Sequence, residues 1–171
     1  MTLADFTNPG LIAPRLAGRD AAGVLQELSL LLHQSGYVPD WLPVCNDALN
    51  HQFLLSTDPT SSLVFPYAHL PGIKQPVFAF GRSDHPVDWR PKRIVPVRLV
   101  LLIAVPAMDS SDYFHLTSGL IQLAGHARQL RRILAADDAP AIHAIFAEFD
   151  VRDRQAAVSV SSPISRCPGA S

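Results

Sequence analysis

The sequence of 171 residues has little of several features that define common protein classes. It contains only two cysteines, Cys45 and Cys167, which lie far apart without the spacing of a metal motif. Charged residues make up 17% of the chain and the formal net charge is −1, which argues against a nucleic-acid or anionic-membrane partner. The longest strongly apolar run, residues 99–105, is too short to cross a bilayer, which needs about 20 residues.

The N-terminal stretch MTLADFTNPG also lacks the basic start and apolar run of a signal peptide. A reduced, cytoplasmic protein is therefore the simplest interpretation. With 48% hydrophobic residues the chain is long enough for one globular domain, which we expect at residues 1–150. Residues 151–171 are polar and rich in serine, and we expect a disordered tail or a linker there.

Apolar residues at helical spacing, together with capping residues, predict four helices. The predicted spans are residues 20–36 after an Asp20 cap, residues 40–51 after an Asp40 cap, a long helix from Ser110, Ser111 or Asp112 to Leu134, and a final helix after Asp137 or Asp138. The arginines Arg128, Arg131 and Arg132 fall late in the long helix, and we interpret them as a solvated face that suits the helix dipole.

Three strands are predicted between these helices. Residues 63–65 form a short strand that Pro66 is expected to stop, and residues 76–80 form the next, followed by a loop at residues 84–92. Residues 95–105 give the strongest strand signal, and they are apolar on both faces. Such a strand is typical of the centre of a sheet covered by helices on both sides, so the fold class is α/β.

Residues 62–83, SLVFPYAHLPGIKQPVFAFGRS, resemble the active-site segment of the type-2 EIIA domains of the bacterial phosphotransferase system. These are the fructose/mannitol-type and nitrogen-regulatory EIIA proteins. The segment carries a proline (Pro66), a Leu-Pro-Gly turn at residues 70–72 and a Gly-Arg pair at residues 81–82. Where the family carries its phosphoacceptor histidine, this chain has Tyr67.

The resemblance extends over about residues 2–150. Residues 54–57 (LLST) are similar to the family's stretch before the active-site strand, residues 97–106 (VRLVLLIAVP) to its central strand, and His115-Leu116 to the pair that opens the next helix. The fold that it implies is a small mixed β-sheet flanked by helices on both faces.

Tyr67 lacks the chemistry of a phosphocarrier. A histidine phosphocarrier needs a neutral imidazole nitrogen as nucleophile, and an ordinary histidine pKa near 6.5 supplies one at pH 7. A tyrosine phenol has an ordinary pKa near 10, so it is protonated at neutral pH, and its phosphate ester is too stable to pass on. We therefore expect that Tyr67 is not a reversible phosphate relay. In one interpretation, the Tyr67 side chain fills the site and offers one hydroxyl group for hydrogen bonding. In the other, Tyr67 is an ordinary turn residue at the end of a strand.

Four further residues complete the site that the resemblance implies. His115 is similar to the second active-site histidine, and His51 stands where the family usually has an arginine. His69 stands at another position that is often arginine. It would act as a displaced phosphoacceptor only if the strand continued past Pro66, which we do not expect. His51 and Thr57 would be remnants of the phosphate site. No carboxylate or cysteine is clearly placed to join the histidines, so we expect no metal and no other cofactor.

Three functions follow from the resemblance. The first is a regulatory or interaction module of the phosphotransferase system that has lost phosphotransfer, with the histidine phosphocarrier protein or another regulated protein as its partner. The second is an active phosphocarrier that uses His69 or His115. The third is a small-molecule sensor that uses the vacated site. The sequence predicts neither the sugar nor the oligomeric state.

Overall fold

The computed structural model describes residues 1–51, 62–89, 95–107 and 111–151. The helices and strands in these ranges are η1 (Leu3–Phe6), η2 (Pro9–Leu11), β1 (Ile12–Ala13), α1 (Ala21–Gln34), α2 (Trp41–Asn50), β2 (Leu63–Val64), β3 (Tyr67–Leu70), β4 (Val77–Val87), β5 (Val97–Pro106), α3 (Ser111–Gly125), α4 (Ala127–Ala135) and α5 (Ala139–Phe146). No helix in these ranges combines the length and the apolar character needed to cross a bilayer.

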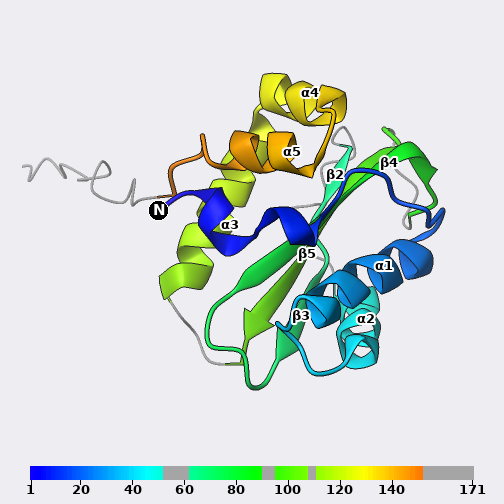
Figure 1. The fold of residues 1–171 in the computed structure, drawn as a ribbon, viewed down its shortest axis with the longest axis vertical. Coiled ribbons are helices and arrows are strands. Elements are labelled where there is room, and N and C mark those ends of the chain that lie inside the picture. The colour runs from blue at the N-terminus through cyan, green and yellow to red at the C-terminus, as the bar shows by residue number, and fades with distance from the viewer. Residues whose placement is uncertain (52–61, 90–94, 108–110, 152–171) are drawn as a thin grey trace, which may run out of the picture.

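One mixed sheet organises the molecule (Figure 1). β4 and β5 pair antiparallel at its centre, β1 pairs parallel with the other side of β4, and β2 and β3 both pair parallel with β5. Helices α1 and α2 lie on one face of the sheet, and α3, α4 and α5 lie on the other (Figure 1). The expected fold class, a mixed sheet with helices on both faces, is confirmed.

The central strand β5 divides the apolar core into two. Its odd-numbered residues from 99 to 105 belong to the cluster on the α3–α5 side, and its even-numbered residues from 100 to 104 belong to the cluster on the α1–α2 side. Side chains of a strand alternate between the faces of a sheet, so a strand that is apolar at every position must be covered on both sides. The prediction of a buried central strand at residues 95–105 is therefore confirmed.

The predicted helix starts follow from local capping chemistry. Asp20 accepts a hydrogen bond from the Gly23 amide, Asp40 accepts one from Leu42, and Asp138 accepts one from Ala141. Each carboxylate thus satisfies an amide that has no partner within its own helix. The first, second and final predicted helices are confirmed, with Asp138 rather than Asp137 as the last cap.

The expectation that Pro66 stops the strand holds for the bounds of the strand, because β2 ends at Val64 and β3 begins at Tyr67, but not for its direction. β2 and β3 pair with β5 in a single register, because Leu63 lies opposite Leu99 and Tyr67 lies opposite Ile103. Proline cannot donate a backbone hydrogen bond, but the Pro66 carbonyl accepts one from the Ile103 amide at 2.9 Å. The strand direction therefore continues across Pro66 to Leu70.

Two other boundaries also differ from the prediction. The loop expected at residues 84–92 begins later, because β4 extends to Val87, which pairs with Val97 after a register shift beyond Arg82. The long third helix is divided into α3 and α4 at His126, which has non-helical backbone angles and follows Gly125. Apolar spacing continued across this break, so the sequence pattern did not reveal it.

The two ends of the described chain lie side by side (Figure 1). The Leu3 amide donates to the Phe149 carbonyl at 3.1 Å, and the Val151 amide donates to the Met1 carbonyl at 3.0 Å. These hydrogen bonds close the domain next to α3. The domain boundary expected at residue 150 stays a prediction, since residues 152–171 lie outside the described part of the chain.

Candidate functional site

Three aromatic rings meet where α2 ends beside β3. The ring centroids of His51 and Tyr67 are 5.5 Å apart, those of Tyr67 and His69 are 5.3 Å apart, and those of His51 and His69 are 6.3 Å apart. Tyr67 and His69 lie on the same face of β3, because they are two residues apart on a continuous strand. Ala68 and Leu70, which alternate with them, are buried. The structure therefore brings together three of the five predicted site residues.

Asp47 connects these rings to the end of α2. Its carboxylate lies 3.2 Å from His51 Nδ1 and accepts a hydrogen bond of 2.7 Å from the His69 backbone amide. The His51 carbonyl accepts a further bond from the Tyr67 amide at 3.3 Å. The outer edge of β3 is thus occupied by α2. We call Asp47, His51, Tyr67 and His69 the α2–β3 junction.

These contacts determine which nitrogen of the His51 ring carries a proton. Nδ1 lies 2.9 Å from the Asp47 carbonyl oxygen as well as 3.2 Å from its carboxylate. Both are acceptors, so Nδ1 carries a proton and donates it. In the neutral ring Nε2 then has a free lone pair. His51 is half-exposed, and an imidazole held in this way can accept a proton or a hydrogen bond from a bound molecule.

His115 is placed differently from the ring cluster. It is the fifth residue of α3, and its Nδ1 donates to the Val151 carbonyl at 3.2 Å. Its role as a second site residue stays a prediction. The neighbouring Tyr113 is coupled to the junction, because burial and then the charge of ionised Tyr67 both raise the pKa of the Tyr113 phenol. Tyr113, at the start of α3, and Tyr67 both pack against the apolar cluster on the α3–α5 side of the sheet.

Two functional candidates were missed by sequence reasoning. Asp47 lies four residues before His51 on a predicted helix, a spacing at which side chains meet, and that signal could have found it. Tyr113 is identified only by its packing against the same apolar cluster as Tyr67. Thr57, the remaining predicted site residue, lies outside the described residues.

Arg82, from the Gly-Arg pair of the sequence resemblance, has a structural role here. It is only 7% exposed, and its guanidinium donates to the carbonyls of Pro14, Ile133, Leu134 and Ala136. Three of these carbonyls end helix α4, where backbone acceptors lack partners within the helix. We call this arrangement the Arg82 junction. It fastens α4 to β4 and leaves Arg82 little capacity for a ligand.

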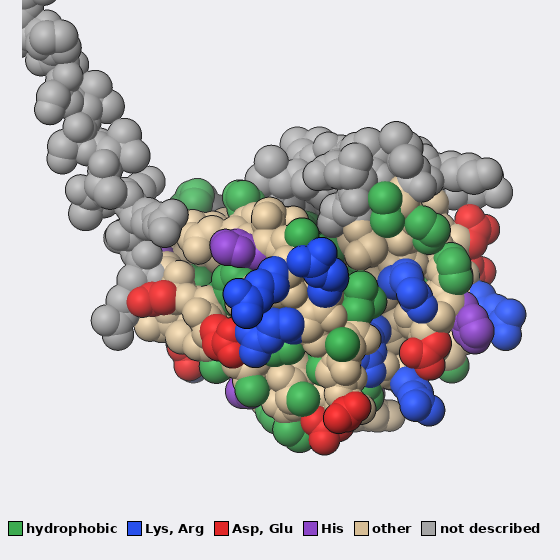
Figure 2. All heavy atoms as spheres, turned by 90° about the horizontal axis from the view of Figure 1, so that it is seen from above, with side chains coloured by type: hydrophobic (Ala, Val, Ile, Leu, Met, Phe, Trp, Pro, Cys, Tyr) green, Lys and Arg blue, Asp and Glu red, His purple; other side chains and the backbone are tan. Residues whose placement is uncertain are grey.

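Basic side chains gather on the end of the molecule that carries α4, with acidic side chains beside them (Figure 2). Arg132 pairs with Glu148 at 2.5 Å on the surface. Because α4 begins at Ala127, Arg128 lies in its first turn and not near a helix C-terminus as expected. The helix dipole therefore does not account for Arg128.

Two cavities lie away from the ring cluster, beside the turn that joins β3 to β4. One has a volume of about 500 Å³ and the other about 300 Å³, and Tyr37, Gly72 and Ile73 line both. A sensor that uses the vacated site requires a cavity bordered by Tyr67, His69 and His115. Neither of these two cavities is bordered by any of the three residues.

A comparison with models of protein families shows to which family the chain belongs. Residues 5–149 match the model of the family described as "Phosphoenolpyruvate-dependent sugar phosphotransferase system, EIIA 2". The chain belongs to this family. Membership confirms the resemblance carried by residues 62–83, and it agrees with the topology described above.

Two curated relatives have the length of a single domain. The chain is 24% identical over 126 residues to the "PTS system fructose-specific EIIA component" of Haloferax volcanii, covering 74% of this chain and 82% of that protein. It is also 24% identical over 147 residues to the "Nitrogen regulatory protein" of Bradyrhizobium diazoefficiens, covering 86% and 95%.

A third relative is much longer. The chain is 24% identical over 150 residues to the "PTS system fructose-specific EIIABC component" of Bacillus subtilis, covering 88% of this chain but only 24% of that protein. The family's fold thus also occurs as one part of a larger chain.

Solved structures support the fold. The nitrogen regulatory protein IIA-Ntr from Neisseria meningitidis superposes with a TM-score of 0.63 at 21% identity, covering 84% of this chain and 98% of that one. The mannitol-specific cryptic phosphotransferase enzyme IIA CmtB from Escherichia coli gives a TM-score of 0.63 at 14% identity, covering 86% and 99%.

Proposed function

We propose that this chain is a regulatory or interaction module of the phosphotransferase system that does not relay phosphate through residue 67. It would work in a bacterial cytoplasm. It would bind a partner, such as the histidine phosphocarrier protein or another regulated protein, through the α2–β3 junction. The observation that carries this proposal is the contact of the Tyr67 ring with His51 and His69. The sequence resemblance assigns Tyr67 to the position of the family's phosphoacceptor.

The chemistry of the junction supports binding over phosphoryl transfer. Tyr67 has no neutral nitrogen nucleophile, and a tyrosine phosphate would be too stable for onward transfer. The residue in place of the family arginine, His51, offers fewer hydrogen-bond donors than a guanidinium and cannot hold a phosphate bidentately. His51 and His69 nevertheless leave ring surface open to a partner, because one is half-exposed and the other exposed.

A second function, an active phosphocarrier, is favoured by one observation. Since Tyr67 and His69 lie two residues apart on β3, they share a face of the sheet, and His69 is exposed. His69 would then receive the phosphoryl group that the family places at position 67. His115 is the other candidate acceptor, and its Nε2 is free of the bond to Val151.

Label transfer from radioactive phosphoenolpyruvate through the general phosphotransferase enzymes separates these functions. We expect no stoichiometric label on the wild-type chain and only weak label on Tyr67→His, because His51 replaces the family arginine. Stoichiometric label on the wild-type chain would contradict the proposal that the chain is a module that has lost phosphotransfer. Its loss in His69→Gln, with His115→Gln still labelled, would then identify His69 as the acceptor. Circular dichroism of each variant checks that it is folded.

A further inference from the structure

The outer side of α4 is lined with arginine. The inner side of this helix packs against the apolar core cluster through Ile133, which is fully buried. Arg128, Arg131 and Arg132 are all exposed. Because an α-helix has 3.6 residues per turn, these three arginines lie within about 100° of arc around its axis. We call them the α4 arginine face.

Little negative charge compensates this face within the described part of the chain. Arg132 pairs with Glu148 and also donates to the Gln129 side chain at 2.6 Å. The hydrogen bond from Arg132 is the main cause that lowers the pKa of Glu148, and the charge of Arg128 contributes without an ion pair. Arg131 forms no ion pair and no side-chain hydrogen bond with the described residues. Three arginines thus share one carboxylate.

The fold itself does not account for these arginines. Arg128 lies one helical turn from both Arg131 and Arg132, and like charges at this spacing repel one another. Arg128 also lies in the first turn of α4, where the helix dipole disfavours a cation. Of the two carboxylates that follow α4, Asp138 caps α5 and the exposed Asp137 forms no ion pair with the described residues. An anionic partner would relieve this repulsion.

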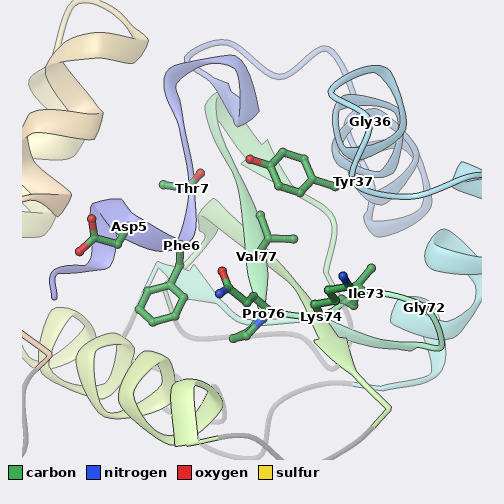
Figure 3. A pocket seen from close by; sticks show the side chains of 11 residues that line it. Asp5, Phe6, Thr7, Gly36, Tyr37, Gly72, Ile73, Lys74, Pro76 and Val77 are labelled. Carbon is green, nitrogen blue, oxygen red and sulfur yellow. The ribbon is translucent and has the colours of Figure 1, made fainter.

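The shape of this face favours another protein over a small anion. The larger cavity of the molecule opens between η1, the loop after α1 and the β3–β4 turn (Figure 3), and the smaller one lies beside the same turn. Neither of these two cavities includes a residue of α4, so neither encloses an anion there. An exposed helix face instead presents its guanidinium groups outward, where each can form two parallel hydrogen bonds to a carboxylate.

Nucleic acid and membrane suit this face less well. Glu148 lies among the arginines and would repel a phosphate backbone. The net charge of the whole chain, −1, provides no general attraction for a polyanion. No large apolar side chain is exposed on α4 or α5, both of which the structure describes in full, so nothing there would insert into a bilayer. An acidic protein segment can place an uncharged residue opposite Glu148.

We propose that the α4 arginine face docks an acidic helical segment of a partner protein. Two of its carboxylates, one helical turn apart, pair with Arg128 and Arg131, and Arg132 borders them while it stays paired with Glu148. Helices α1 and α2 lie on the opposite face of the sheet from α4 (Figure 1), so a partner bound here leaves the α2–β3 junction open. The proposal does not rest on the function proposed above, because it uses no residue of that junction.

The test is an NMR titration of the ¹⁵N-labelled whole chain, at low salt, with a synthetic helical peptide that has glutamate at every fourth position and alanine elsewhere. We expect saturable shifts of the Arg128 and Arg131 side-chain Nε–H signals. The dissociation constant should be on the order of 1 mM, because exposed ion pairs each contribute little. The same peptide with glutamine in place of glutamate should not bind, and added salt should weaken the binding.

Four variants locate the binding. Arg128→Gln and Arg131→Gln should each weaken it about threefold, and the two together about tenfold. Glu148→Gln removes the competing carboxylate and should tighten the binding about threefold, an effect that an uninvolved surface would not show. Lys74→Gln removes an exposed cation on the β3–β4 turn and should change nothing. Circular dichroism checks that each variant is folded.

Several outcomes would overturn the proposal. These are shifts that do not saturate, wild-type affinity in the double variant, and weaker binding in Glu148→Gln. Oligothymidylate and vesicles of phosphatidylserine and phosphatidylcholine test the other anionic partners. If either one binds as tightly as the acidic peptide, the face does not select an acidic protein segment, and the proposal is wrong.

Discussion

Two polar junctions join the end of a helix to the sheet, and they differ in how much of their hydrogen-bonding capacity is used. At the Arg82 junction the guanidinium is buried and donates to four backbone carbonyls. At the α2–β3 junction Asp47 connects His51 and the His69 amide near the surface. The ring nitrogens there are only partly engaged.

The difference separates a structural contact from a candidate site. A buried guanidinium that donates to backbone carbonyls of distant segments stabilises the fold and is poorly accessible to a ligand. A half-exposed imidazole with one nitrogen fixed, and the other without a hydrogen-bond partner among the described residues, is positioned and still available. The Gly-Arg pair and the histidines belong to the same sequence resemblance, but Arg82 is buried, whereas His51 is half-exposed and His69 is exposed.

The largest effect is expected at the buried junction. Arg82→Met would leave several buried or half-buried carbonyls without donors, so the free energy of unfolding should fall by about 3 kcal/mol or more. Urea denaturation measures this loss. Arg131→Met, an exposed control on α4, should stay within about 0.5 kcal/mol of wild type. If Arg82→Met does not fold, Arg82→Lys should fold with an intermediate loss. An Arg82→Lys chain as stable as wild type would contradict the structural role.

A smaller effect is expected at the α2–β3 junction. Asp47→Ala removes the side-chain acceptor of the His69 amide and one of the two acceptors of His51 Nδ1, whose bond to the Asp47 carbonyl remains. The free energy of unfolding should fall by about 1 kcal/mol, because both partners are partly solvated. Hydrogen exchange of the His69 amide should become faster. The matched control is Asn46→Ala, an exposed neighbour on the same helix. Equal stability and equal His69 exchange in the two variants would show that Asp47 does not hold β3.

The smallest effect is expected at the exposed Arg132–Glu148 pair. Hydrogen bonding to Arg132 lowers the pKa of Glu148, so its stabilising contribution is present above the ordinary glutamate pKa and is lost as pH falls through the lowered value. Melting temperatures of wild type and Arg132→Met from pH 7 to pH 3 should therefore differ slightly at pH 7 and converge in acid. High salt should shrink the difference at pH 7. A gap that widens in acid would contradict this assignment.

Local chemistry explains what could be predicted from sequence. Asp20 and Asp40 were identified as caps because a cap involves residues only two or three positions apart. The central strand was identified because apolar residues on both faces allow few other structures. The rings of Tyr67 and His69 were identified as site residues by the resemblance, but their common face was not.

Contacts between distant segments explain what was missed. β3 keeps the register of β2 after Pro66 because both strands pair with β5, and no local signal carries that information. Arg82 is separated by 51 to 54 residues from its carbonyl partners on α4, and His69 by 22 residues from Asp47. Sequence reasoning thus identified residues of both junctions without showing which were engaged and which were free.

The pairing of Met1 and Leu3 with Phe149 and Val151 has a consequence for how the domain can be connected to other proteins. Since residues 1–3 and 149–151 lie side by side next to α3, a partner fused before residue 1 and one fused directly after residue 151 would be attached close to the same place. A short linker could also join the two ends of residues 1–151, and new ends could be opened in an exposed turn. The α2–β3 junction lies on other elements, so such rewiring would leave it intact.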